Sequence, residues 1–202
     1  MLTKLYREGG IVSLNSIISH RDKFIYVPMP GISDDGIVKS ISQVTKSSRV
    51  DYIDNDYIES PGYFTFTFVK HPLNKLCEYY MDNILNDVNQ IQLGRDELSK
   101  RANHMSFEDF ILYISEISPK ELRMELQPAY SIPEVEFVGK FENFQDDFKT
   151  VSQTIGREYY GTWCKDYCTN DIYQDFFTSE IFELIKSHYQ KDLDRFNYFY
   201  ES

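Results

Sequence analysis

The sequence contains no long hydrophobic run and little cysteine. No apolar stretch approaches the roughly 18 residues of a transmembrane helix, and no charged-then-apolar signal segment opens the chain. The cysteines, Cys77, Cys164 and Cys168, are too few for a disulfide framework and do not complete a zinc site, so we expect free thiols and no metal. The simplest interpretation is a cytoplasmic protein, although a secretory protein without its leader would have the same composition.

Positive charge is also scarce. The chain has 21 Lys and Arg against 32 Asp and Glu, which gives a formal net charge of −11. Such an acidic chain is a poor binder of nucleic acid or of an anionic membrane, so any anion site must be a local basic pocket. Its 202 residues, 42% of them hydrophobic, are enough for one sizeable core, and we expect a single domain over residues 1–202.

The most informative stretch covers residues 64–80. Its first part, Phe64 to Val69, has the length and the aromatic and β-branched composition of a buried strand. Apolar residues then recur at helical spacing after Pro72, a residue that the first turn of a helix tolerates. We therefore predict a strand, a sharp turn and a helix. Lys70 would stand at the end of the strand, where open parallel sheets bind ligands.

A second unit of the same kind precedes it. Residues 23–30 contain a continuous apolar run, a turn-rich loop follows from Gly31 to Gly36, and helical spacing begins at Ile37. Such a unit can hold a phosphate on the backbone N–H groups at a helix N-terminus. Gly31 and Gly36 have Walker A spacing, but Lys39 and Ser40 come two residues too late. This displacement argues against a conventional nucleotide triphosphatase or a kinase.

Weaker patterns predict the remaining elements. We expect helices around 11–18, 73–85, 107–117, 144–155 and within 172–199, and short strands near 50–53 and 135–138. Ser106 has the position of an N-cap for the third of these helices. Strands that alternate with helices predict an α/β fold with a mainly parallel sheet.

Five stretches, in this order, resemble the carbohydrate sulfotransferase family. They are KFIYVPMP with its glycine loop, FTFVKHPLNKLCEYY, SFEDFILYI, VEFVGKFENFQDDF and IYQDFFTSEIFELIKSHYQKDLDRFNYF. The resemblance implies a P-loop-like three-layer αβα domain with a mainly parallel central sheet flanked by helices. It also implies transfer of a sulfuryl group from the co-substrate 3′-phosphoadenosine 5′-phosphosulfate (PAPS) to a hydroxyl of a carbohydrate or similar acceptor, without a metal.

The same resemblance implies a donor site made of two segments. The residues that match the family's phosphosulfate loop and its 3′-phosphate element are Pro30, Gly31, Ile32, Ser33, Gly36, Lys70, Pro72, Lys75 and Glu78. In the first segment Gly31 stands where the family has a lysine, so the charge that would neutralise the leaving group is absent. Asp34 and Asp35 favour the helix N-terminus and would compete with an anion there.

The second segment departs from the family as well. Lys70 replaces an arginine, which keeps the charge but loses the bidentate fork. Glu78 replaces a serine, and its carboxylate would repel a phosphate unless it turns away or pairs with Lys70 or Lys75. Either donor binding is rearranged, or the chain keeps the fold as a binding module with reduced or lost activity.

No residue maps securely onto the family's catalytic base, which is a His or Glu that deprotonates the acceptor hydroxyl. Lys39 could reach back into the loop, His71 lies at the key turn, and Glu125 is a candidate by location only. Each has a plainer interpretation: a surface lysine, a junction residue and a surface acid. In the family's G-[RK]-F-E pattern, we expect Glu142 to hold loops together and Lys140 to contact the donor or the acceptor.

Overall fold

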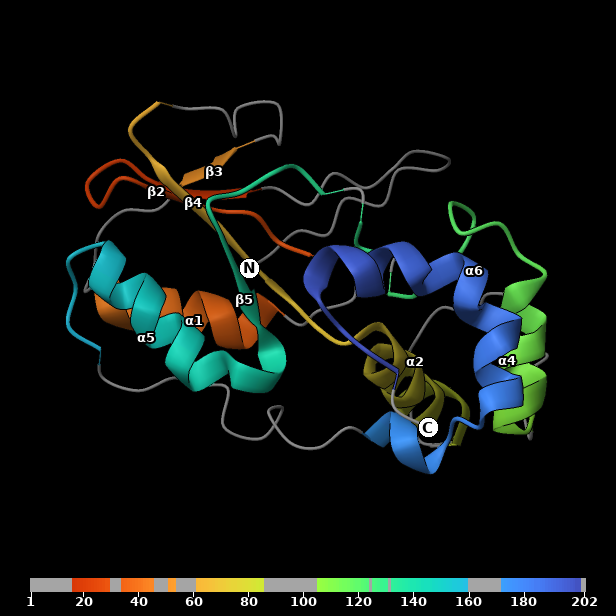
Figure 1. The fold of residues 1–202 in the computed structure, drawn as a ribbon. Coiled ribbons are helices and arrows are strands. Elements are labelled where there is room, and N and C mark those ends of the chain that lie inside the picture. The colour runs from red at the N-terminus through yellow and green to blue at the C-terminus, as the bar shows by residue number, and fades with distance from the viewer. Residues whose placement is uncertain are drawn as a thin grey trace.

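The computed structural model describes residues 16–29, 34–45, 51–53, 61–85, 105–123, 125–130, 132–159 and 172–200. These residues form a mixed α/β arrangement, with helices packed around an open five-stranded sheet (Figure 1). Every helix in the described part is too short or too polar to cross a membrane.

The sheet has the strand order β3-β1-β2-β4-β5. Its strands are β1 (Ser16–Ser19), β2 (Phe24–Tyr26), β3 (Asp51–Ile53), β4 (Phe64–Val69) and β5 (Phe137–Lys140). β4 is parallel to both β2 and β5, whereas β1 is antiparallel to both β2 and β3. Four of the five strands therefore point the same way, although only two of the four pairings are parallel.

Strand β1 corrects one expectation. The spacing of isoleucines predicted a helix over 11–18, but residues 16–19 form a strand, and residues 11–15 lie outside the described part. Ile17 pairs with Tyr26 and Ile18 with Ile25, and the two isoleucines belong to cores on opposite faces of the sheet. Adjacent β-branched residues suit a strand buried on both faces, and the pairing with β2 overrides the helical spacing.

The helices follow the predicted positions closely. They are α1 (Asp34–Thr45), α2 (Pro72–Tyr80) with a π-helical turn (Met81–Leu85), α4 (Phe107–Ser115), α5 (Phe144–Thr154) and α6 (Ser179–Phe196). Short 3₁₀ turns, Phe141–Asn143 and Ile172–Asp175, precede α5 and α6. One difference concerns Gly36. It was expected in the loop, but α1 already begins at Asp34, so Gly36 lies in the first helical turn.

Caps explain where several helices begin and end. The Ser106 hydroxyl accepts a hydrogen bond from the Asp109 N–H at 3.1 Å and donates to the Asp109 carboxylate at 2.7 Å, which confirms the predicted cap of α4. The Thr178 hydroxyl likewise accepts the backbone N–H of Ile181, at 3.3 Å, and caps α6. At the other end of α6, Asn197 adopts a left-handed conformation with φ of 52°, which a C-cap favours.

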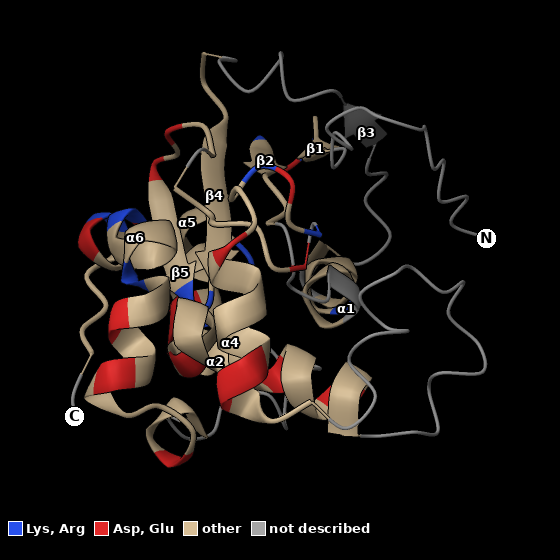
Figure 2. Ribbon diagram, turned by 90° about the vertical axis from the view of Figure 1, so that its right-hand side faces the viewer, with Lys and Arg blue, Asp and Glu red and all other residues tan. Residues whose placement is uncertain are grey.

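Two clusters of buried side chains hold helices to the sheet. One joins alternate residues of β2 and β4 to α1 and α5, and includes Phe24, Tyr26, Phe66, Phe68, Ile37, Ile41, Phe144 and Phe148. The other contains Met29 and Val69 together with residues of α2, α4 and α6. In both ribbon views α1 and α6 lie on opposite sides of β4 (Figures 1 and 2). Helices thus flank β4 on both sides.

Candidate functional site

The carboxyl ends of β2, β4 and β5 meet at one edge of the sheet, because these neighbouring strands are parallel. This is the edge at which open α/β sheets bind ligands. Of the residues expected there, Pro30, Gly31, Ile32 and Ser33 lie outside the described part, as do the side chains of Asp34 and Asp35. The described edge is formed by the ends of β4 and β5 and by the segment that follows α6.

Lys70 directly follows β4, and its side chain is almost buried. Its ammonium forms an ion pair with the Glu78 carboxylate from α2 and lies 5.4 Å from the centre of the Phe141 ring. The pairing is one of the two arrangements in which Glu78 would not simply repel a bound phosphate. It also means that much of the Lys70 charge is already neutralised within the protein.

The Lys75 side chain contacts a different part of the protein from the Lys70 side chain. Lys75 is only 6% exposed, and its ammonium donates to the Gln127 carbonyl at 2.7 Å. Burial lowers the pKa of Lys75 to about 8, although the negative charges of Asp192 and Glu125 act in the opposite direction. The two lysines expected to act together on one phosphate are therefore each engaged with a separate part of the protein.

His71 caps α2 instead of facing the solvent. Its Nδ1 accepts a hydrogen bond from the Leu73 N–H at 3.2 Å, and its Nε2 lies 3.1 Å from the Phe199 carbonyl. Because the first partner can only donate and the second can only accept, the ring is neutral and carries its proton on Nε2. The ring also stacks on Tyr173 with centres 4.5 Å apart. Both nitrogens are occupied, which favours the junction role over that of a catalytic base. Pro72 follows as the buried first residue of α2.

Glu142 ties three segments together at this edge. One carboxylate oxygen accepts the His71 backbone N–H at 2.7 Å, and the other accepts the Tyr198 hydroxyl at 2.8 Å. Lys140 donates to the Asn197 carbonyl at 2.9 Å and lies 4.3 Å from the centre of the Tyr198 ring. Glu142 thus has the predicted role of holding loops together. Lys140 is attached to the segment after α6.

A second set of contacts holds the segment 125–130, which contains Glu125. Asp192 accepts the backbone N–H groups of Ala129 and Tyr130, both at 2.7 Å, and the Tyr189 hydroxyl donates to the Leu126 carbonyl. Burial raises the pKa of Asp192, against the effect of these hydrogen bonds and of nearby Lys75. Asp192 and Tyr198 both belong to the last of the five stretches on which the family resemblance rests. Their hydrogen bonds give the end of this stretch a structural role that we had not predicted.

The remaining candidates are at the surface. Lys39 is exposed on α1, and the Glu125 carboxylate is exposed beside Arg123, whose Nε lies 3.4 Å from it. Of the three possible catalytic residues, Glu125 alone combines a carboxylate with exposure to solvent.

Cys77 is a buried free thiol whose pKa is raised by burial, and Cys164 and Cys168 lie outside the described part. Within the described ranges, no group of three or more His, Cys, Asp or Glu is arranged to hold a metal ion.

Comparisons of the chain with models of known protein families, with curated proteins and with solved structures found no match.

Proposed function

We propose that the chain is a sulfotransferase-type domain with a P-loop-like αβα fold. It would bind PAPS at the carboxyl edge of β2 and β4 and transfer the sulfuryl group to a hydroxyl of a carbohydrate or similar acceptor. The observation that carries the proposal is the arrangement of its two strand–helix units. β2 and β4 are adjacent and parallel, so the carboxyl end of β2 and the Lys70 turn between β4 and α2 lie at the same edge.

The proposed roles follow from the positions of the side chains. Lys70 would contact the 3′-phosphate once Glu78 gives up part of its ion pair. Glu125 is the best-placed residue to take the acceptor proton, because its side chain is 43% exposed whereas both nitrogens of His71 are occupied. The Lys75 ammonium donates to the carbonyl of Gln127, two residues along the chain from Glu125, so a positive charge lies near the proposed base.

Calorimetric titration with adenosine 3′,5′-bisphosphate tests the donor site. We expect binding in the micromolar to millimolar range, and a loss of at least about tenfold in affinity for Lys70→Met, which removes a charge-assisted hydrogen bond. Lys149→Met, which changes an exposed lysine on α5, is the matched control and should leave the affinity unchanged. Absence of binding at millimolar concentration would rule out the enzyme.

A non-catalytic binding module on the same fold is the second candidate. The Lys70–Glu78 ion pair and the burial of Lys75 against Gln127 favour it, because both lysines are already engaged within the protein. This candidate predicts that Gly31→Lys combined with Glu78→Ser creates a donor affinity that the natural chain lacks. Tight donor binding by the natural chain would contradict it.

A further inference from the structure

Three polar side chains, those of Tyr63, His20 and Lys23, meet at the amino ends of β2 and β4, away from the carboxyl ends where the donor site is proposed. Tyr63 immediately precedes β4, and His20 and Lys23 belong to the turn between β1 and β2. The Tyr63 hydroxyl lies 2.7 Å from His20 Nδ1 and 3.3 Å from Lys23 Nζ. The Lys23 ammonium also lies 4.7 Å from the centre of the Tyr63 ring. None of these residues belongs to the proposed donor site.

The direction of the Lys23 hydrogen bond follows from the chemistry of the groups, and that of the His20 hydrogen bond from the tautomer of the ring. An ammonium can only donate, so Lys23 donates to the Tyr63 oxygen. In the tautomer of neutral His20 that carries its proton on Nε2, the Tyr63 hydroxyl donates its proton to Nδ1. A hydroxyl with a base on its proton and a cation at its oxygen has the arrangement of an activated nucleophile. His20 and Lys23 are exposed and Tyr63 is half-buried, so a reagent in solution can reach the oxygen.

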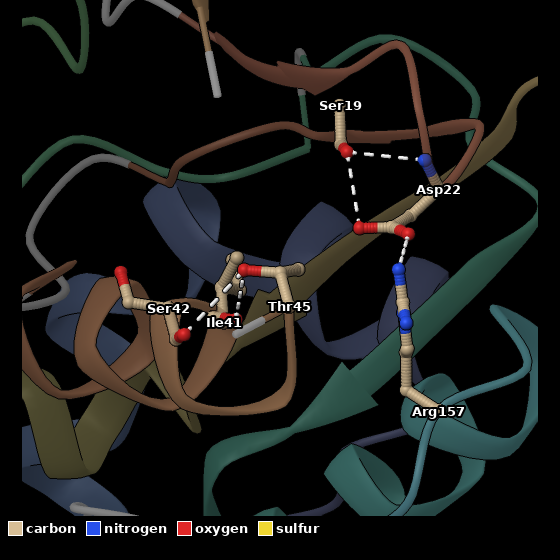
Figure 3. A network of polar contacts seen from close by, with 6 residues as sticks. All are labelled: Ser19, Asp22, Ile41, Ser42, Thr45 and Arg157. Carbon is tan, nitrogen blue, oxygen red and sulfur yellow. Dashed lines mark hydrogen bonds and ion pairs between the residues drawn. The ribbon is translucent and has the colours of Figure 1, made fainter. Parts of the chain in front are cut away.

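The turn that contains His20 and Lys23 is held in place by the polar contacts of Asp22. Asp22, whose side chain is 3% exposed, forms an ion pair with Arg157, and accepts the Ser19 hydroxyl at 3.3 Å (Figure 3). Lys23 has a φ of 55°, a left-handed conformation that is uncommon for a residue other than glycine. Its carbonyl accepts the N–H of Phe64 at 2.8 Å, which ties the turn to the residue next to Tyr63. A supported geometry of this kind keeps the three groups aligned.

We propose that Tyr63 is a nucleophilic hydroxyl at which the chain accepts an activated sulfonyl or sulfuryl group. A bond forms between Tyr63 Oη and sulfur as the bond from sulfur to its leaving group breaks. The leaving group departs with the electron pair, and the phenol proton passes to His20 Nδ1. Lys23 places its positive charge near the oxygens on sulfur, where negative charge gathers during the step. This reactivity does not depend on donor binding at the other edge.

Labelling of the full chain with benzenesulfonyl fluoride tests the proposal. Its leaving group is fluoride, and peptide mass spectrometry measures the rate at each tyrosine. Tyr130 is an internal reference because it is also half-buried and has the Lys191 ammonium 5.0 Å from its ring centre. Among the described residues, no histidine contacts the Tyr130 hydroxyl. We expect Tyr63 to react at least about tenfold faster than Tyr130, as general-base assistance provides.

Variants at exposed positions separate the roles of the three groups. His20→Gln keeps a polar side chain that cannot take the proton, and should lower the rate at Tyr63 to that of Tyr130. Lys23→Met should slow the reaction less, and Arg21→Met, an exposed change in the same turn, should leave it unaltered. Circular dichroism verifies that each variant folds. Equal rates at Tyr63 and Tyr130, or an unchanged rate in His20→Gln, would overturn the proposal.

Discussion

The Lys70 ammonium is paired with the carboxylate of Glu78, eight residues further along the chain. The Lys70 side chain is 7% exposed and the Glu78 side chain 35%, so the cation has lost most of its water. A desolvated ammonium needs a partner far more than a surface lysine does. The pair therefore serves the stability of the β4–α2 junction, whether or not a ligand ever competes for Lys70.

A double-mutant cycle measures this pair. Lys70→Met, Glu78→Gln and the double variant should give a coupling free energy of about 1–3 kcal/mol in urea unfolding, because the Lys70 side chain is only 7% exposed and water screens its charge poorly. The exposed pair Lys186–Glu183 on α6, 2.8 Å apart, is the matched control. Its coupling should stay below about 0.5 kcal/mol. Equal couplings for the two pairs would contradict the role of burial.

Because burial lowers the pKa of Lys75, we expect the free energy of unfolding to depend on pH. The pKa of Lys75 is lowered to about 8 in the folded protein, from 10.5 in the unfolded chain. Between these values the unfolded state binds more protons, so the free energy of unfolding rises with pH through this lysine. The cost of burying the ammonium is fully present below pH 8 and is relieved towards pH 10.5.

Lys75→Met removes this dependence. The stability of the wild type relative to Lys75→Met should increase by up to about 3 kcal/mol between pH 7 and pH 10, measured by urea unfolding. Cys77 and Tyr189, whose pKa values burial raises, act in the opposite direction, but they are common to both proteins and cancel. A difference that stays constant with pH would show that Lys75 titrates normally.

A side chain at position 139 would clash with the core, so we expect substitution of Gly139 to destabilise the protein. A Cβ atom at this position would stand 2.4 Å from the Phe68 ring, which is fully buried and packs on Phe144 with ring centres 4.6 Å apart. Because that ring cannot easily move, Gly139→Ala should destabilise the protein by about 1–3 kcal/mol in thermal or urea unfolding. The neighbouring change Val138→Ala, at an exposed position, is the control and should have little effect. Combining Gly139→Ala with Phe68→Leu should recover part of the loss.

The hydrogen bond between Tyr198 and Glu142 connects the segment after α6 to the end of β5, and its contribution to stability can be measured. The Tyr198 hydroxyl donates to Glu142 at 2.8 Å, so Tyr198→Phe removes a hydrogen bond to a charged group and should cost about 1–2 kcal/mol of unfolding free energy. Tyr200→Phe is the matched control, because its hydroxyl is 3.5 Å from the Phe177 carbonyl. Equal effects of the two changes would mean that Glu142 does not anchor this segment.

Local sequence patterns were sufficient where neighbouring residues alone favour one conformation. The strand Phe64–Val69, the proline at the start of α2 and the Ser106 cap all appear where they were predicted. Each rests on short-range chemistry: a β-branched and aromatic run, a residue without a backbone donor, and a hydroxyl within reach of its own helix. The helical spacing around Ile17 and Ile18 was misleading, because pairing with β2 outweighed local preference.

The local sequence pattern did not predict the hydrogen-bond and ion-pair partners of the polar side chains. Lys70 and Lys75 looked like a pair in the sequence, yet one meets Glu78 and the other meets Gln127, 52 residues away in the chain. His71 likewise finds Phe199 at a separation of 128 residues. The sequence thus predicted most of the helices and strands in their order, with β1 as an exception, and the resemblance to a sulfotransferase stays a prediction. Long-range packing settled which groups are engaged, because burial obliges each polar atom to find a partner wherever the folded chain supplies one.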